Sequence, residues 1–259
     1  MKLAILGGGN MGGAIAFGAV DRKIVAAVDV TISHPSRTLC ELLEQHGHRV
    51  GLTTDNRKAV EEADLVVVAV KPWLAEEVFG EIATVLRPNQ IVVSIVASAT
   101  LSTLASYLGK PQQPIFRVIP NTAITLGRSA TFVCHQHATE AQCNSISALF
   151  EPLGALFFVE EAQMESVTAL SSCGIAYAFK YIDAAVTGGV TLGVDREQAL
   201  RIVMQTIEGA LALLDANNSQ PQTEIDKVTT PGGITLRGLA AMEQAGFSQA
   251  VIAGLKASK

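Results

Sequence analysis

The first twelve residues constrain the fold of this chain most strongly. The short apolar run 3–6 is typical of a buried parallel strand. Gly7, Gly9 and Gly12 follow at GxGxxG spacing, and a mostly apolar helical pattern begins after them. This order of strand, glycine turn and helix is the setting of a dinucleotide-binding fingerprint, in which the helix N-terminus faces the pyrophosphate. The stretch therefore predicts a dinucleotide site, and the alternative is a tight turn without a ligand.

Further strands and helices alternate through the first 160 residues. Strands are expected at 50–53, 64–70, 91–95, 114–118, 130–134 and 156–159, with helices at 39–45, 56–63, 73–86, 100–108 and 139–150. Alternation of this kind predicts an α/β fold built on a doubly wound parallel sheet. The expected dinucleotide-binding domain spans residues 1–160.

The second strand can be placed in two ways, and each implies a different cofactor. A strand over 24–28 would end at Asp29, whose carboxylate could bind the ribose 2′-hydroxyl of NAD. A strand over 29–33 would end at Ser33-His34-Pro35-Ser36-Arg37, where hydroxyls and a cation suit the 2′-phosphate of NADP. The density of β-branched residues and the stop at Pro35 favour the second placement.

Other strand ends bring candidate residues to the same edge, because ligands of open parallel sheets lie beyond the carboxyl ends of the strands. Asn56 follows the third expected strand, and Ala69 to Pro72 follow the fourth. Lys71 is either a cofactor contact or a solvated loop residue.

The pattern changes near residue 161, after which only helices are expected. They cover 162–192 as one helix or two, 196–214, 221–227 and 236–244, with Ser248 as the cap of the last helix. Several are apolar on more than one side, which predicts burial in a dimerisation domain over 161–259. Gly232 and Gly233 form a turn whose backbone N–H groups can hold an anion, or which is an ordinary interhelical turn.

Composition excludes several classes of function. The net charge of -5 argues against nucleic acid as a partner. No apolar run in the first half approaches the roughly 20 residues of a membrane span, and the early first strand leaves no room for a signal peptide. The four cysteines show no CxxC spacing, so we expect neither a metal site nor a redox motif, and reduced thiols indicate a cytoplasmic protein.

Five stretches in order resemble the pyrroline-5-carboxylate reductase family over nearly the whole chain. They are Gly7-Gly8-Gly9-Asn10-Met11, Ala69-Val70-Lys71-Pro72, Arg117-Val118-Ile119-Pro120-Asn121-Thr122, Ala169-Leu170-Ser171 with Gly174 and Ala176-Tyr177, and Thr230-Pro231-Gly232-Gly233 with Thr235.

The resemblance implies NADPH-dependent reduction of 1-pyrroline-5-carboxylate to L-proline, with NADH as a possible substitute. It implies a Rossmann-type domain followed by an all-helical domain interlocked in homodimers, which in this family often assemble into decamers of five dimers. Thr235 is the expected catalytic residue, hydrogen-bonded to the ring nitrogen. The substrate is expected at Glu161, Gly232, Gly233, Ile234 and Thr235, and the cofactor at Gly7, Gly8, Gly9, Asn10, Met11, His34, Ser36, Arg37, Asn56, Ala69, Val70, Lys71, Pro72, Val96 and Ala97.

Some positions depart from the family pattern, namely Ser172, Cys173 and Ile175, together with Ala123 and Ile234. They leave open an NADP-binding paralogue with a regulatory role. A second alternative is a β-hydroxyacid dehydrogenase using Lys180, although this lysine stands further from Gly174 than that family's catalytic lysine does from its glycines.

Overall fold

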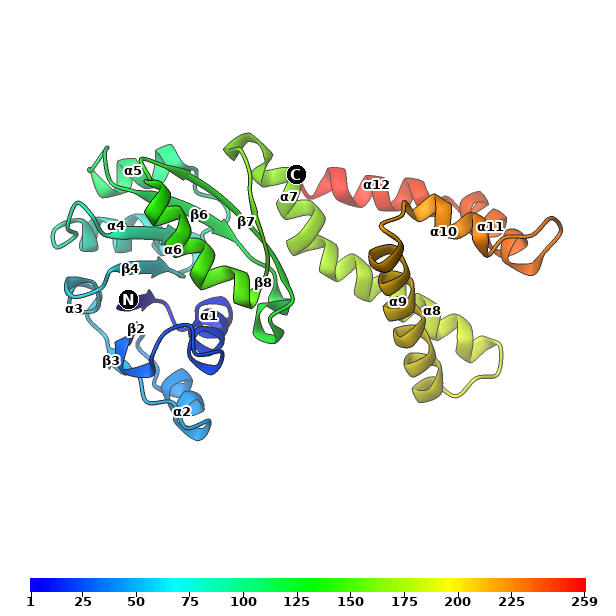
Figure 1. Cartoon of the computed structure of the whole chain (residues 1–259), viewed down its shortest axis with the longest axis horizontal. Helices are drawn as coiled ribbons and strands as arrows, with labels where there is room; N and C mark the ends of the chain where they lie inside the picture. Colours follow the sequence, from blue (N-terminus) through cyan, green and yellow to red (C-terminus); the bar gives the residue numbers. More distant parts are fainter. The chain divides into compact units, whose positions relative to one another are not determined.

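A computed structural model describes all residues, 1–259, and divides into two compact units, Met1–Ser172 and Cys173–Lys259 (Figure 1). The first unit extends past the expected domain boundary at 160/161 because residues 161–172 pack against the sheet. Met164 is fully buried there, and Ser171 is hydrogen-bonded to Asn121. No helix combines the length and apolar character that a membrane crossing requires.

The first unit contains one eight-stranded sheet in the order β3-β2-β1-β4-β5-β6-β7-β8. Its strands are β1 Leu3–Leu6, β2 Val30–Ser33, β3 Gly51–Thr53, β4 Leu65–Val68, β5 Ile91–Ser94, β6 Ile115–Ile119, β7 Ser129–Gln136 and β8 Gly154–Phe158. Its α-helices are α1 Asn10–Asp21, α2 Thr38–Gln45, α3 Asn56–Glu61, α4 Ala75–Ala83, α5 Leu101–Leu108, α6 Glu140–Phe150 and α7 Met164–Thr168.

The sheet is parallel except at one pair of strands. β7 runs antiparallel to β6, a local departure within the predicted doubly wound parallel sheet, which is otherwise confirmed. The reason is the connection, because residues 120–128 hold only a short 3₁₀ turn, Thr122–Leu126. A parallel crossover needs about a dozen residues or more, usually including a helix.

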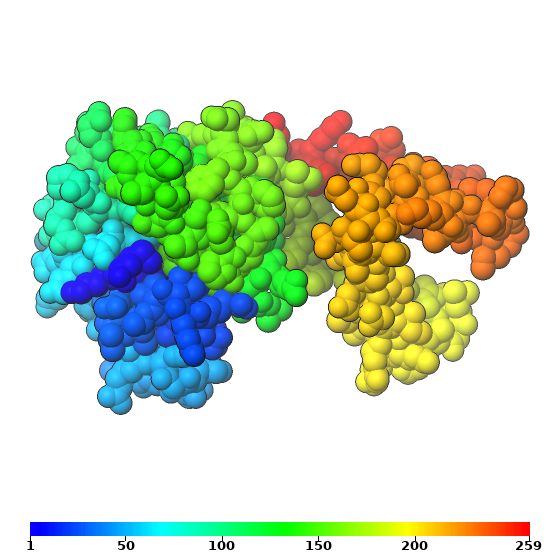
Figure 2. Space-filling view, in the orientation of Figure 1, coloured from blue at the N-terminus to red at the C-terminus, as the bar shows by residue number.

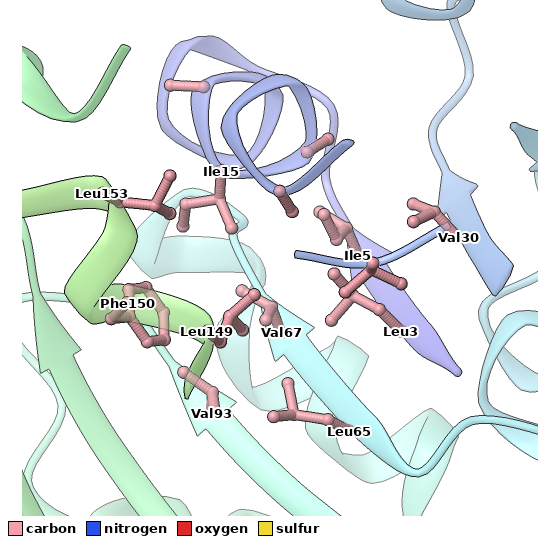
Figure 3. Close-up of a cluster of buried hydrophobic side chains, with 14 of the residues drawn as sticks. Leu3, Ile5, Ile15, Val30, Leu65, Val67, Val93, Leu149, Phe150 and Leu153 are labelled. Carbon is pink, nitrogen blue, oxygen red and sulfur yellow. The ribbon is translucent and has the colours of Figure 1, made fainter. Parts of the chain in front are cut away.

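Alternate strand residues face two hydrophobic clusters on opposite sides of the sheet. Leu3, Ile5 and Val67 pack under α1, α2 and α6, and Figure 3 shows Ile15 of α1 and Phe150 of α6 on this side. Ala4, Leu6 and Val68 pack under α3, α4 and α5. This two-sided burial explains why the central strands are apolar at every position.

The second unit is entirely helical. It contains α8 Gly174–Thr191, α9 Arg196–Asn217, α10 Pro221–Lys227, α11 Ile234–Gln244 and α12 Phe247–Ala257. Asp195 caps α9 as expected, accepting hydrogen bonds from the N–H groups of Glu197 and Gln198. Ser248 does not cap α12, because Gly246, with φ +84°, reverses the chain two residues earlier. Of the residues of α9, only Ala199 is buried, and Figure 2 shows this helix at the surface.

The region 162–192 forms two helices rather than one, which is the second of the two expected arrangements. A 3₁₀ turn, Glu161–Gln163, leads into α7, and a π-helical segment, Ala169–Cys173, separates α7 from α8. The hydroxyls of Ser171 and Ser172 donate to the backbone carbonyls of Ala130 and Pro120, at 3.1 and 3.0 Å. These bonds tie the π-helical segment to the sheet.

Candidate cofactor and substrate sites

The glycine turn lies between β1 and α1, and packing requires glycine at two of its positions. Gly7 has φ +103°, and a Cβ atom there would lie 2.4 Å from the carbonyl oxygen of Ala69. A Cβ atom on Gly12 would lie 2.0 Å from the carbonyl oxygen of Gly7. Both distances are far below van der Waals contact, so the close approach of β1, α1 and the residues after β4 depends on these glycines.

Gly9 differs from these two glycines because packing within the protein does not require glycine at this position. A Cβ atom there would meet no atom within 4 Å. Gly9 caps α1 with no side-chain hydrogen bond, and the first turn of α1 holds no acidic residue. The helix therefore presents unpaired N–H groups and partial positive charge to open space, which fits a phosphate group.

The end of β2 settles the two placements of the second strand. The strand is Val30–Ser33, whereas Asp29 lies in a 3₁₀ turn before it, at the opposite edge of the sheet from the glycine turn. The placement that offered Asp29 to an NAD ribose is therefore wrong.

The residues after β2 border the glycine turn. The Gly7 N–H donates to the Ser33 carbonyl oxygen at 2.9 Å, and the ring of His34 would lie 3.1 Å from a Cβ atom on Gly8. The Ser36 hydroxyl accepts a hydrogen bond from the Thr38 N–H at 3.2 Å, and Arg37 is exposed beside it. A hydroxyl and a free guanidinium thus stand at this strand end, without a carboxylate among residues 33–38.

The neighbouring strand ends complete the edge. The Ala69 N–H donates to the Leu6 carbonyl oxygen at 2.7 Å, and Lys71 is exposed and forms no ion pair. Asn56, at the start of α3, donates through Nδ2 to Glu81 Oε2 of α4 at 2.8 Å. Val96 is buried, whereas Ala97 is exposed and its carbonyl oxygen accepts a hydrogen bond from Arg117.

Glu161 holds two elements of the first unit together. Its Oε1 accepts a hydrogen bond from the Leu101 N–H at 2.6 Å and lies 3.4 Å from Nη1 of Arg117. Its Oε2 makes no hydrogen bond within the chain and remains available to another group. Glu161 also borders an open pocket of about 400 Å³, together with Leu101, Cys134, His135 and Phe158.

Arg117 is a buried cation beside Glu161 that was not among the expected site residues, although it begins one of the motifs quoted above. Its side chain is only 7% exposed, and its Nε has no hydrogen-bond partner. The available signal was a cation within an otherwise apolar strand. Cys134, its cross-strand neighbour, has its pKa raised to about 11, first by burial and then by the charge of Glu161.

The turn before α11 carries the candidate substrate residues of the second unit. Gly232 has φ +73°, and a Cβ atom on Gly233 would lie 2.6 Å from Oγ1 of Thr230. Gly233 caps α11 without a side-chain hydrogen bond, and the first turn has no acidic residue. Ile234 and Thr235 are exposed. The Gly233 N–H donates to the Thr230 carbonyl oxygen at 2.9 Å, so the turn offers the N–H groups of Ile234 and Thr235 and one hydroxyl to an anionic ligand.

Comparison with known proteins places the chain among related enzymes. Residues 2–98 match the family described as "NADP oxidoreductase coenzyme F420-dependent", and residues 161–259 match "Pyrroline-5-carboxylate reductase dimerisation". A pyrroline-5-carboxylate reductase of Synechocystis is 32% identical, over all of this chain and 96% of the relative. The chain belongs to the pyrroline-5-carboxylate reductase family.

Other members of the pyrroline-5-carboxylate reductase family are similar along the full chain. Pyrroline-5-carboxylate reductase 1 of Dictyostelium discoideum is 38% identical over 99% of this chain, and the match spans about half (48%) of that longer relative. The crystal structure of a Plasmodium falciparum pyrroline carboxylate reductase with NADP bound has a TM-score of 0.91 at 27% identity, covering 100% of this chain and 95% of that one.

Proposed function

We propose that this chain catalyses the NAD(P)H-dependent reduction of 1-pyrroline-5-carboxylate to L-proline. The observation that carries the proposal is the open glycine turn at Gly9, with the unpaired N-terminus of α1, in a chain of this family. The alternatives of a β-hydroxyacid dehydrogenase using Lys180 and of a regulatory paralogue gain no comparable support.

The cofactor is held along the carboxyl edge of the sheet. The pyrophosphate binds the N–H groups of the turn that follow Gly7, up to Met11, because the Gly7 N–H is already bonded to Ser33. Ser36 and Arg37 bind the 2′-phosphate, which favours NADPH over NADH. The remaining residues line the path of the cofactor; they are His34, Asn56, Ala69, Val70, Lys71, Pro72, Val96 and Ala97.

The substrate is bound by an anion site and two polar side chains. Gly232 and Gly233 shape the turn, and the N–H groups of Ile234 and Thr235 hold the carboxylate. The Thr235 hydroxyl hydrogen-bonds the ring nitrogen, and Glu161 offers its unused Oε2 to the protonated imine.

The chemistry requires little from the protein beyond orientation. Bound NADPH supplies a hydride to the C=N carbon of the ring. Binding of the imine in its protonated form removes the need for a separate acid, since the nitrogen already carries its proton. Glu161 favours that protonation state by charge, and Thr235 fixes the ring relative to the incoming hydride.

The proposal includes self-association. Many large apolar side chains of the second unit are exposed in the single chain, including Phe179, Leu211 and Ile202. A second copy of the chain would remove them from water, which supports a homodimer. Assembly of five dimers into a decamer and a cytoplasmic location are the further parts of this proposal.

The testing experiment follows NADPH absorbance in the presence of 1-pyrroline-5-carboxylate, with NADH run in parallel and L-proline identified by mass spectrometry. We expect turnover with both cofactors and a higher kcat/KM with NADPH. Absence of proline formation with either cofactor, in protein shown by calorimetry to bind NADPH, would overturn the proposed activity.

A further inference from the structure

Trp73 is a large aromatic side chain exposed beside the proposed cofactor edge. It is the only tryptophan of the chain, and it is 76% exposed. It lies in the 3₁₀ turn Pro72–Leu74, directly after Lys71 and Pro72 and immediately before α4. The exposed indole leaves a large apolar area in contact with water. A ligand that covers the indole would remove this area from water, which is favourable.

Trp73 directly precedes α4, and an observed contact places this helix beside α3. Glu77 and Glu81 are four residues apart on α4 and share one side of it, whereas Trp73 lies before the helix in the 3₁₀ turn. Glu81 accepts the hydrogen bond from Asn56, which begins α3. Trp73 therefore lies in the connection that leads from the end of β4 into the helix that contacts α3.

The strand order assigns the ends of β2 and β3 to the adenosine half of the cofactor. β2 and β3 lie on the same side of β1, and the residues after them are Ser36, Arg37 and Asn56. Under the proposed function, Ser36 and Arg37 hold the 2′-phosphate, so the adenosine lies over the ends of β2 and β3. Asn56 and Trp73 then border the space next to that ribose.

We propose that Trp73 is the stacking platform for the adenine base of NADPH. The inference rests on the proposed function and adds a specific residue to its cofactor site. An adenine ring and an indole ring both have extended π-faces, and stacking between them excludes water from both.

Fluorescence provides a direct test because Trp73 is the only tryptophan. The wild-type chain is titrated with adenosine 2′,5′-bisphosphate, which carries the base and the 2′-phosphate, and separately with nicotinamide mononucleotide. We expect saturable quenching by the first compound and none by the second. Quenching by nicotinamide mononucleotide alone would place Trp73 at the other half of the cofactor and overturn the inference.

Variants give an independent measurement by calorimetry. Trp73→Ala is expected to weaken NADPH binding about tenfold, which corresponds to about 1.4 kcal/mol, while Trp73→Phe keeps most of the affinity. Val28→Ala is the matched control, because Val28 is 85% exposed in the 3₁₀ turn before β2, at the opposite edge of the sheet. In steady-state assays Trp73→Ala should raise the KM for NADPH and leave kcat unchanged.

The outcomes separate this inference from the proposed function. If wild-type protein binds NADPH, but adenosine 2′,5′-bisphosphate leaves the emission unchanged and Trp73→Ala binds as tightly as wild type, the inference is wrong and the function stands. If calorimetry shows that wild-type protein binds neither NADPH nor NADH, both are wrong.

Discussion

Arg117 and Glu161 form an ion pair in which Nη1 lies 3.4 Å from Oε1, and only the arginine is buried. The same carboxylate oxygen accepts the hydrogen bond from the Leu101 N–H at the start of α5. Glu161 is therefore a structural residue through Oε1 and a candidate substrate ligand through Oε2. These two roles can be separated by substitution.

Glu161→Gln retains an acceptor for the Leu101 N–H and removes the charge. We expect it to raise the KM for 1-pyrroline-5-carboxylate strongly and to lower the free energy of unfolding by about 1 kcal/mol. Glu161→Ala loses the acceptor as well, and the expected loss of stability is about 1–3 kcal/mol. Urea denaturation and steady-state kinetics measure the two effects, and equal kinetics in Glu161→Gln and wild type would remove Glu161 from the substrate site.

The glycine turn offers a contrast between two alanine variants. Gly9→Ala meets no neighbouring atom, so we expect a change in stability under about 1 kcal/mol and a tenfold or greater loss of NADPH affinity. Gly12→Ala forces a Cβ atom against the Gly7 carbonyl oxygen and should destabilise the fold by about 1–3 kcal/mol. Calorimetry with NADPH and urea denaturation of both variants check this. Unchanged NADPH affinity in Gly9→Ala would contradict a pyrophosphate at Gly9.

Thr235→Ala tests the proposed contact with the ring nitrogen. We expect kcat/KM to fall by an amount equivalent to about 1–3 kcal/mol, the scale of a lost polar contact. Thr235→Ser keeps the hydroxyl and is expected to retain most of the activity. Kinetics of Thr235→Ala that match those of wild type would remove the residue from the mechanism.

The raised pKa of Cys134 predicts a pH dependence of stability. The pKa of this thiol has its ordinary value of about 9.0 in the unfolded chain, and burial raises it to about 11 in the folded chain. Between these values the unfolded state binds fewer protons, so the contribution of Cys134 to stability declines as pH rises from about 9 to 11. Urea denaturation at several alkaline pH values should show a shallower decline for Cys134→Ala than for wild type. A decline of equal slope would contradict the assignment.

Self-association is expected to depend on the exposed apolar side chains of the second unit. Leu211 on α9 is 62% exposed and Phe179 on α8 is 61% exposed in the single chain. We expect light scattering to report a dimer or a larger assembly, and Leu211→Glu to shift it toward the monomer because burial of an unpaired carboxylate is unfavourable. The matched control is Leu126→Glu, at an exposed position of the first unit.

Local signals were sufficient for most elements of this protein. The glycine spacing, the apolar strands and the caps at Asp55, Thr100, Thr139 and Asp195 depend on neighbouring residues, so the order of strands and helices could be predicted from the sequence. The residues at the strand ends were predicted for the same reason, because a parallel sheet brings those ends to one edge. Their roles in binding stay predictions.

The features that depend on contacts between residues distant in sequence were decided only by the tertiary structure. The reversed direction of β7 follows from pairing across a connection too short for a crossover. The place of Asp29 outside β2 follows from pairing of Val30–Ser33 with β1. The burial of Arg117 needs Ala97 and Glu161, which lie 20 and 44 residues away, and no local pattern encodes such a meeting. The sequence by itself determined the order of the elements and which residues follow the strand ends, whereas long-range contacts decided strand direction, strand register and the position of the buried charge.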